Sequence, residues 1–487
     1  MEPTNLRFGG GATDTILSPL IAILLVVAVI LILCLPRRYA IAPLIFTIFT
    51  VPLGQVVVLL GLHFSVMRIV ILAGLTRLLI SGRGLKGGTF PGGFNWIDRI
   101  FAFFALAQMV TFWLMYMGIP PIFKSLGSLV DVLGAYCVVR FLVRDREDVR
   151  RAIKVFAVVA VVVGANMICE RALHTNIFLL ASGVKAVAAV RLGSVRSQGA
   201  FSVYLTAGAF GATLIPLFVW LWSDKKSRAV AVLGIAGALG IALTTVSSSP
   251  VVACFAGIAG LCFWPLRSRL RLLRWCMVFS LIGLQLVMKA PVWALIGRID
   301  LTGSSSGYHR YMLVDNFIRH FGDWWLIGFS GYDKWGWDMW DLSNQFVAYG
   351  LNGGLITLTL VLVLLSLCFA GLGRARKMAG RNLNEAWFFW CLGAALFAHV
   401  VAFFGMCYFD QMQFSFYFLV ATISVSLSGA IRQPVRKLTR PQSLWELESE
   451  SDLIEEYQFA SQAIEGTSDP EPELPEPDLR VSRIFYR

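Results

Sequence analysis

About thirteen apolar runs of helical length follow one another along this chain, and they limit its possible folds more than any other feature. They lie near residues 16–35, 40–61, 64–81, 99–118, 124–143, 152–169, 200–222, 228–246, 250–266, 272–289, 345–371, 386–406 and 412–431. Hydrophobic residues make up 57% of the sequence and charged residues only 15%, which is too apolar for a soluble domain. The sequence therefore predicts an all-α, polytopic integral membrane protein with about 12–13 transmembrane helices.

The first run, Leu17 to Leu35, is preceded by a single basic residue, Arg7. A cleaved signal sequence has a shorter apolar core and a basic start, so we expect this run to remain as a helix. The third run is the least regular, because Arg68 and Arg77 interrupt it.

The nine cysteines show neither a CxxC pattern nor a Cys/His ligand spacing, so we expect no disulfide framework and no metal site.

Basic residues gather in every second connection between the apolar runs. They lie at Arg37–Arg38, from Arg77 through Lys86 to Arg99, from Arg144 to Lys154, and at Lys225–Arg228, Arg267–Arg274, Arg374–Arg381 and Arg432–Arg440. Cytoplasmic connections carry such an excess of Lys and Arg, which predicts an outside N-terminus and a cytoplasmic C-terminus. The net charge of +13 is thus explained by topology, and we expect no nucleic acid as a partner.

Two outward-facing connections carry arginines that topology does not require. The first, about 170–199, contains Arg171, Lys185, Arg191 and Arg196, and the second, about 290–343, contains Arg298, Arg310 and Arg319. An arginine near the outer leaflet favours an anionic partner, and its forked donors suit the oxygens of a pyrophosphate. The alternative for each arginine is pairing with lipid head groups or with acids such as Asp315 and Asp323.

The second loop contains an amphipathic pattern from Tyr308 to Trp325. Apolar residues recur three and four apart at Tyr311, Val314, Ile318, Phe321 and Trp325. This spacing predicts a helix that lies at the membrane surface. Arg310 and Arg319 lie nine residues apart on this helix. Each of them therefore lies about 90° away from a common face, one on either side of it.

Few side chains outside the spans can act as bases. They are His174, His309, His320, Asp333, Asp338 and Asp341. A structural role is the alternative for the histidines, and capping of the following helix is the alternative for Asp341. Gly350 and Gly354 form a GxxxG pattern, for which we expect close helix packing.

Three features together resemble the O-antigen ligase and polymerase superfamily of bacterial membrane glycosyltransferases, over roughly residues 10–435. The first is many spans with one large external loop in the C-terminal third. The second is an Arg-x-x-Gly-x-Phe motif that enters a span, here Arg196–Phe201. The third is a polar pair that closes the loop, here Ser343-Asn344, followed by Gly354-Leu-Ile-Thr357.

The polar pair departs from one branch of the superfamily. Ligases that attach O-antigen to lipid A-core have a histidine, proposed as the catalytic base, at the position of Ser343. The stretch Asp341-Leu-Ser-Asn-Gln345 instead fits the Asp-x-x-Asn-Gln variants of exopolysaccharide polymerases. Either the general base lies elsewhere, with Asp341 or His309 nearest in sequence, or the chain belongs to the polymerase branch, and we favour the second.

The resemblance implies glycosyl transfer from a polyprenyl-diphosphate-linked oligosaccharide to a sugar hydroxyl, on the outer face of the cytoplasmic membrane. Arginines would stabilise the leaving diphosphate, so the resemblance implies neither a metal ion nor another cofactor. The predicted substrate contacts are Arg191, Arg196, Arg310, Arg319 and Ser343, and the predicted catalytic residues are His309, Asp341 and Asn344. Membrane lipids and other polysaccharide-assembly proteins are the further partners.

Two alternatives stay open. The alternative within the enzyme class is a ligase that transfers glycan to lipid A-core. The alternative from another class is a lipid-linked sugar flippase or transporter. Such a protein would place ionisable residues along a path through the spans, and it often has two related halves. Against a transporter, we note few charges in the spans apart from Arg68 and Arg77, and no visible repeat.

Two further segments have a distinctive composition. Trp335, Trp337 and Trp340 suit either sugar stacking or anchoring at the membrane interface. After the membrane domain, residues 1–435, twelve acidic residues lie between Glu446 and Asp478. This predicts a mostly disordered cytoplasmic tail over residues 436–487, with one short helix around Leu444 to Ala463.

Overall fold

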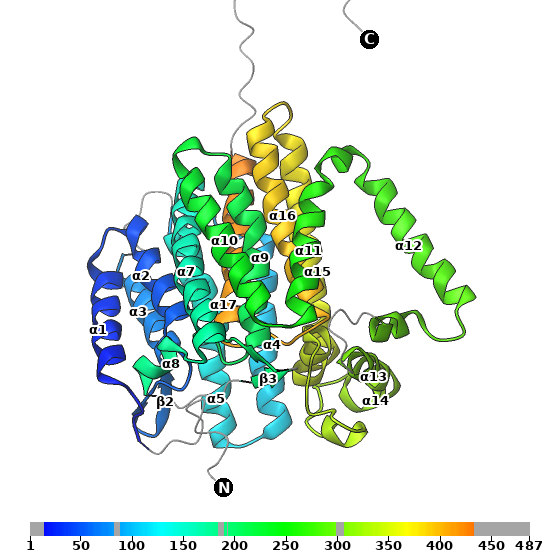
Figure 1. Ribbon diagram of the computed structural model, residues 1–487, viewed down its shortest axis with the longest axis horizontal. Helices are drawn as coiled ribbons and strands as arrows, with labels where there is room; N and C mark the ends of the chain where they lie inside the picture. The colour runs from blue at the N-terminus through cyan, green and yellow to red at the C-terminus, as the bar shows by residue number, and fades with distance from the viewer. Residues whose placement is uncertain (1–13, 82–87, 184–188, 192, 299–305, 433–487) are drawn as a thin grey trace, which may run out of the picture. The chain divides into compact units, whose positions relative to one another are not determined.

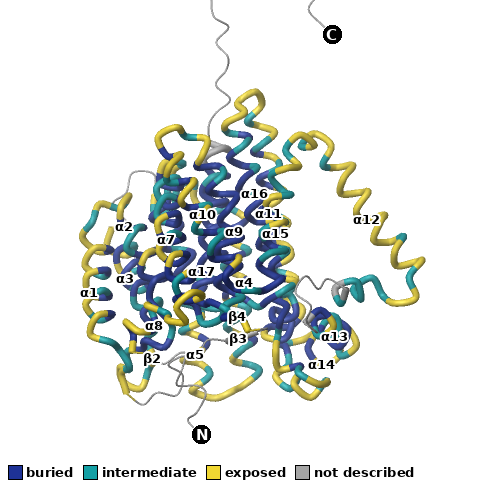
Figure 2. The backbone as a smooth tube through the Cα atoms, in the orientation of Figure 1, coloured by how far each residue is buried: buried dark blue, intermediate teal, exposed yellow. Residues whose placement is uncertain are grey.

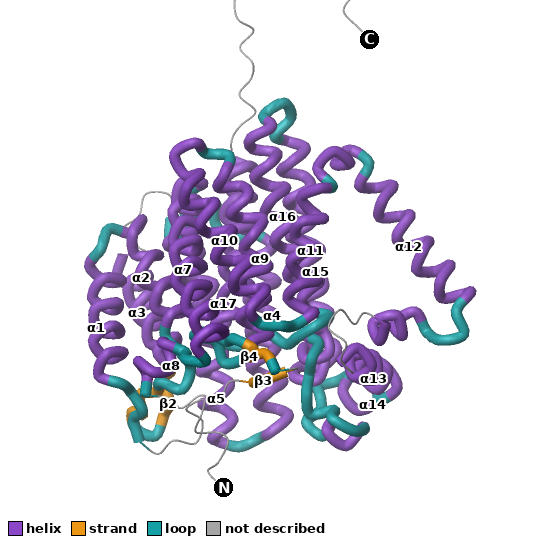
Figure 3. The backbone as a smooth tube through the Cα atoms, viewed as in Figure 1, coloured by secondary structure: helices purple, strands orange, loops and turns teal. Residues whose placement is uncertain are grey.

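The computed structural model describes residues 14–81, 88–183, 189–191, 193–298 and 306–432, and this part of the chain is almost entirely helical (Figures 1 and 3). Eight of its helices are long and apolar enough to cross a membrane, and two shorter helices, Pro19–Cys34 and Ser248–Cys262, are also apolar. The predicted class, an all-α polytopic membrane protein, is confirmed. The predicted acidic tail, 436–487, lies outside the described residues.

Every predicted apolar run contains a helix. In chain order these are α1 (Pro19–Cys34), α2 (Arg37–Thr50), α3 (Val66–Ser81), α4 (Trp96–Tyr116), α5 (Ile119–Leu129) with a π-helical turn (Val130–Gly134) and α6 (Ala135–Leu142), α7 (Arg146–Leu173), α9 (Tyr204–Trp222), α10 (Arg228–Thr244), α11 (Ser248–Cys262), α12 (Leu270–Val287), α15 (Gln345–Met378), α16 (Leu383–Phe403) and α17 (Gln411–Arg432). The connections add α8 (Ile177–Ser182), α13 (Ser306–Arg319), α14 (Phe321–Trp324) and the strands β1 (Val56–Leu59), β2 (Leu62–Ser65), β3 (Ala189–Arg191) and β4 (Ser194–Arg196).

The second predicted run, 40–61, is only partly helical. Helix α2 ends at Thr50, two residues before Pro52, which has no N–H to continue the helix. The β-branched residues that follow form an antiparallel hairpin, with β1 paired to β2. Its turn residues Leu60 and Gly61 have φ of 52° and 77°, the backbone that a two-residue hairpin turn requires. The prediction of one helix was wrong here because it used the length of the apolar run and not its turn residues.

The basic connections meet at one end of the helical bundle, which we call the basic end. Arg37, before α2, forms an ion pair of 2.8 Å with Asp148 in the first turn of α7. Arg376, near the end of α15, donates to the backbone carbonyl of Arg267 over 2.9 Å. We call the opposite end, with both hairpins and helices α13 and α14, the loop end (Figure 1). The side of a membrane that each end faces stays a prediction.

The spans contain more charge than Arg68 and Arg77. Asp131 lies in the π-helical turn and Arg140 in α6, both inside the predicted span 124–143. Arg68 binds Asp131 through two hydrogen bonds, of 3.1 and 2.6 Å. The expectation of nearly charge-free spans was wrong. The run is apolar on average although it contains Asp131 and Arg140, whose partners Arg68 and Asp98 lie in other segments of the protein.

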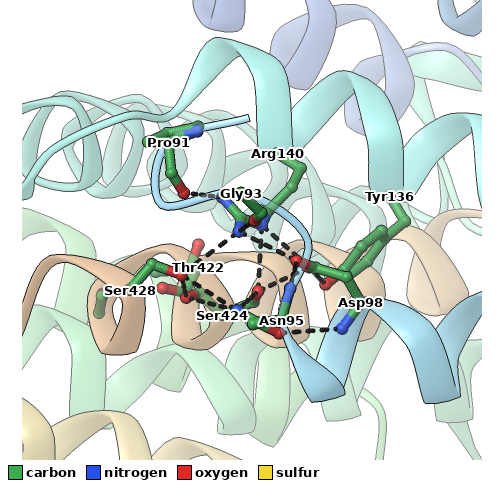
Figure 4. Close-up of polar contacts among 10 residues, drawn as sticks. Pro91, Gly93, Asn95, Asp98, Tyr136, Arg140, Thr422, Ser424 and Ser428 are labelled. Atoms are coloured by element: carbon green, nitrogen blue, oxygen red, sulfur yellow. Dashed lines mark hydrogen bonds and ion pairs between the residues drawn. The ribbon is translucent and has the colours of Figure 1, made fainter. Parts of the chain in front are cut away.

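Arg140 is the centre of a polar network near the basic end (Figure 4). Its side chain is 1% exposed and forms an ion pair of 3.0 Å with Asp98, which begins α4. Asp98 also accepts from the hydroxyls of Tyr136 and, over 2.7 Å, of Ser424 on α17. Asn95 caps α4 and donates to the same Ser424 hydroxyl over 2.8 Å. The network joins α4, α6 and α17, three helix ends that the charge pattern placed on one side.

Burial differs strongly among the helices (Figure 2). In an 18-residue apolar stretch of α9, 83% of the residues are buried, whereas none of the residues in the corresponding stretch of α12 is buried. Helix α9 is central because it packs against α7, α10, α11 and α16. Close approach requires glycine here, since a Cβ on Gly211 would lie 2.5 Å from the carbonyl oxygen of Ala238. The exposed apolar surface of α12 suits contact with lipid.

A break in α15 fixes the large loop against the bundle. At Gly354 φ is 67°, so the helix ladder opens there. The N–H of Phe329 binds the carbonyl of Leu351 over 2.8 Å, and the N–H of Leu355 binds the carbonyl of Trp325 over 2.8 Å. Close packing at the GxxxG pattern is present, but its partner is the large loop: a Cβ on Gly354 would lie 2.5 Å from the carbonyl oxygen of Leu326.

Candidate functional site

The Arg-x-x-Gly-x-Phe motif forms a tight turn at the loop end, between β4 and α9. Arg196 ends β4, and Gly199 has a φ of 60°, which favours glycine. The carboxylate of Glu170, at the end of α7, accepts from the N–H groups of Gln198 (3.1 Å) and Gly199 (2.9 Å). The Asn176 amide donates to the carbonyl of Gly199 over 2.8 Å. The turn is thus held by two side chains: Glu170 binds its N–H groups, and Asn176 binds one of its carbonyls.

The guanidinium of Arg196 reaches across the turn to two other segments. It lies over the ring of Tyr204, 4.0 Å from the ring centroid, and donates to the Tyr204 hydroxyl over 2.5 Å. It also donates to the carbonyl of Val246 over 3.2 Å. Arg191, the second predicted contact in this loop, pairs with Ser194 through its backbone, and its side chain lies outside the described part of the chain.

Arg310 and Arg319 have different environments on α13, as their spacing predicts. Arg310 is 9% exposed and donates to the Ser249 hydroxyl over 2.7 Å. The Arg319 side chain is 71% exposed and forms an ion pair of 2.7 Å with Asp315, four residues earlier. Arg319 therefore fits the alternative of local pairing, and Arg310 remains as the candidate that faces the bundle.

Arg196 and Arg310 converge on one short segment, residues 246–249, which runs from the connection after α10 into the first turn of α11. They bind Val246 and Ser249, which lie three residues apart at the start of α11. Val246 is a β-branched residue with a φ of 48°, a conformation that costs free energy. The N-cap residue Ser247 forms no side-chain capping bond. A helix N-terminus beside two guanidinium groups favours an anion, and a phosphate in particular.

His309 lies next to Arg310 and contacts Asp341. Its Nε2 is 2.9 Å from the backbone carbonyl oxygen of Asp341. A carbonyl only accepts, so Nε2 is the donor in this contact, and in the neutral imidazole Nδ1 is an acceptor. Burial raises the pKa of the Asp341 carboxyl, Asp338 raises it further, and His309 and Arg310 lower it. The two candidate bases therefore lie together, and they are joined through the backbone of Asp341.

Ser343 and Asn344 lead directly into α15. The amide oxygen of Asn344 accepts from the N–H groups of Phe346 (2.9 Å) and Val347 (3.2 Å), so Asn344 is the N-cap. Capping, the alternative role for Asp341, thus belongs to Asn344. Ser343 is 6% exposed, and its hydroxyl has no hydrogen-bond partner in the described part of the chain.

Buried polar atoms without a hydrogen-bond partner among the described residues include the hydroxyls of Ser197 and Ser343, in two of the predicted motifs, and the Nδ1 of the candidate base His309. Buried polar groups in folded proteins are nearly always paired, with protein or with ordered water. These atoms are therefore the places where a polar ligand gains hydrogen bonds without displacing any that the protein makes.

The connection between α16 and α17 ties the motifs together. The carbonyl of Gly405 accepts from the Ser249 hydroxyl over 3.2 Å. The N–H of Tyr408 donates to the side-chain oxygen of Gln345 over 2.5 Å. The amide of Gln411 donates to the carbonyl of Ala200 over 3.0 Å, in the Arg196 motif. Sequence reasoning missed this connection because its polar residues match no motif.

Other predicted residues of the large loop pack against neighbouring rings or are exposed. His320 stacks on Trp335 with ring centroids 4.7 Å apart, and Trp335 also stacks on Phe329 at 5.5 Å, so both have packing roles. Trp337 and Trp340 are 85% and 71% exposed, which leaves them open to a membrane surface or a sugar.

No family model matches this sequence, and no curated protein matches it. Among the described residues, no group of three or more His, Cys, Asp or Glu side chains is placed to hold a metal ion.

Proposed function

We propose that this protein is a membrane glycosyltransferase that lengthens polyprenyl-diphosphate-linked oligosaccharides at the outer face of the cytoplasmic membrane, in exopolysaccharide or O-antigen biosynthesis. One observation carries the proposal: Arg196 and Arg310, from two distant loops, bind the same short segment, residues 246–249, at the start of α11. A lipid diphosphate presents several anionic oxygens at the membrane surface. Two forked cations and a helix N-terminus are suited to it.

In the proposed reaction, an acceptor hydroxyl attacks the anomeric carbon of the donor sugar. The bond from that carbon to the diphosphate oxygen breaks, and the lipid diphosphate leaves with the electron pair. Arg196 and Arg310 stabilise the charge that grows on it. The Nδ1 of His309 accepts the proton of the hydroxyl, since this nitrogen is buried and has no partner among the described residues.

The polymerase is favoured over the ligase by the position of the imidazole. Ser343 stands where the ligases have their histidine, and here His309 from α13 supplies an imidazole beside Asp341. A flippase is disfavoured because these charged groups inside the spans have partners within the protein. Arg68 pairs with Asp131 and Arg140 with Asp98, and Arg77 donates to the backbone carbonyl of Leu35.

The decisive experiment uses the purified full-length protein in lipid vesicles, with a polyprenyl-diphosphate oligosaccharide and no nucleotide. A ladder of lengthened products supports the polymerase, and a single transfer onto lipid A-core supports the ligase. Movement of the donor across the vesicle without transfer supports the flippase and contradicts the enzyme.

The arginine proposal has its own variants and a matched control on the same helix. We expect Arg196→Ala and Arg310→Ala to abolish turnover while the protein stays folded. Arg319→Ala should retain turnover, because the Arg319 side chain is 71% exposed and pairs with Asp315. Near-normal activity of both Arg196→Ala and Arg310→Ala would contradict a diphosphate contact.

A further inference from the structure

We infer that Glu170 is a positioning residue, which holds the Arg196 turn in the geometry that a lipid diphosphate needs. The inference rests on the proposed function, because Arg196 is taken as a contact of the donor diphosphate. Glu170 belongs to none of the motifs in the sequence, and it lies in the last turn of α7.

The contact between Glu170 and the turn is buried and specific. Glu170 is 2% exposed, and one of its oxygens, Oε2, accepts both hydrogen bonds, from Gln198 and from Gly199. An acidic side chain inside a membrane protein is costly unless its surroundings satisfy it. Here the two backbone N–H groups do so, and neither group belongs to a helix or a strand.

The carboxylate bonds to the backbone three residues or fewer from Arg196. From the other side, Asn176 holds the carbonyl of Gly199, so the peptide units around Gly199 are fixed at both polar edges. Arg196 extends from this turn to Tyr204 and Val246. A shift of the turn therefore moves the guanidinium away from the start of α11.

Loss of the acceptor has a predictable cost. Without Glu170, two buried N–H groups lose their partner, and each unpaired group costs about 1–3 kcal/mol. The turn can regain these bonds only by moving. Misplacement of a substrate-binding group by about 1 Å can reduce catalysis about a hundredfold.

An amide can replace the carboxylate in this contact. Both bonds end on a single oxygen, so the carbonyl oxygen of a glutamine can accept both of them. A positioning role thus predicts that Glu170→Gln retains function and Glu170→Ala loses it. A role for the negative charge itself predicts that both variants fail.

The test measures binding and transfer with the full-length protein in vesicles, with the polyprenyl-diphosphate oligosaccharide as the probe. For Glu170→Ala we expect the Kd and the KM for the donor to rise at least tenfold, with the KM for the acceptor unchanged. Glu170→Gln should stay within about threefold of the wild type, which equals less than about 0.7 kcal/mol. Glu147→Gln is the matched control, because Glu147 lies on the same helix with a side chain that is 50% exposed.

A double-mutant cycle separates positioning from general damage. If Glu170 acts through Arg196, then Glu170→Ala adds no further loss of donor binding to Arg196→Ala. Additive losses, an equal rise in the acceptor KM, or wild-type donor affinity in Glu170→Ala would each overturn the inference. Should Glu170→Ala aggregate, Glu170→Asp takes its place, since the shorter side chain withdraws the carboxylate from both N–H groups.

The outcome for the wild type distinguishes this inference from the proposed function. A wild type that binds the donor without transferring it contradicts the proposed glycosyltransferase activity. The double-mutant cycle of donor binding, with Glu170→Ala and Arg196→Ala, still decides the role of Glu170. A wild type that does not bind the lipid diphosphate overturns both.

Discussion

Arg310 and Ser249 link the large loop to the membrane-spanning bundle through a hydrogen bond of 2.7 Å, from the guanidinium to the hydroxyl. The same hydroxyl donates to the carbonyl of Gly405 over 3.2 Å, so it connects three separate segments. A guanidinium fixed in this way is already oriented before an anionic ligand arrives, which lowers the cost of binding.

This relationship predicts the effect of Ser249→Ala. The variant removes the hydroxyl that accepts from Arg310 over 2.7 Å, and a hydrogen bond to a charged group contributes about 1.5–3 kcal/mol. We therefore expect the donor KM to rise about tenfold to a hundredfold, measured at a fixed acceptor concentration. Ser249→Thr keeps a hydroxyl and is the control; equal losses in both variants would contradict the role of this bond.

A second prediction separates the two candidate bases. His309→Ala should lower kcat by about 10²–10⁴ while donor binding persists, because it removes the proton acceptor. Asp341→Asn should have a smaller effect, since His309 contacts the backbone carbonyl of Asp341 and the substitution keeps that carbonyl. Both are measured as kcat in the transfer assay. If Asp341→Asn is the more damaging variant, the carboxylate is the base.

The predicted spans show what length and charge can establish. Apolar runs of helical length predict helices because lipid forces the backbone to satisfy its own hydrogen bonds. The alternating basic clusters predicted which connections share an end, and the ion pair of Arg37 with Asp148 joins two of them. The β1–β2 hairpin was missed because Leu60 and Gly61 differ little in hydropathy from the residues of a span.

The candidate site was predictable only in part. Arg196, His309, Arg310 and Asp341 stand out as polar groups in an apolar chain, and the structure brings His309 against Asp341. Ser249 could not be found in this way, since its contact with Arg310 spans 61 residues and no local pattern records such a contact. Glu170 was missed for the same reason.

The buried ion pair of Arg140 with Asp98 predicts a large effect on stability. Asp98→Ala leaves a guanidinium that is 1% exposed without its carboxylate, and removal of one partner of a buried pair costs about 3–5 kcal/mol. We expect a clearly lower Tm in detergent. The control is Glu147→Ala, which breaks the partly exposed pair with Arg150 and should cost about 1 kcal/mol or less. Equal shifts in Tm would contradict the importance of the network.

The last prediction concerns Asp410, in the connection between α16 and α17. Burial, together with the nearby Asp131, raises the pKa of Asp410 from 3.8 to about 6, although Arg68 acts to lower it. The folded protein thus holds a proton on this group more tightly than the unfolded chain does. The stabilisation from this proton is complete below pH 3.8 and is lost as the pH rises through about 6.

Asp410→Asn is neutral at every pH, so it should be more stable than the wild type at pH 7.5, by up to about 3 kcal/mol. The advantage should shrink through about pH 6 and vanish near pH 4. The measurement is Tm in detergent at several pH values for the wild type and the variant. Asp333→Asn, at an exposed acid of the loop end, controls for the loss of one negative charge. A difference that stays constant with pH, or a variant that is less stable at pH 7.5, would show that the Asp410 carboxyl is not the titrating group.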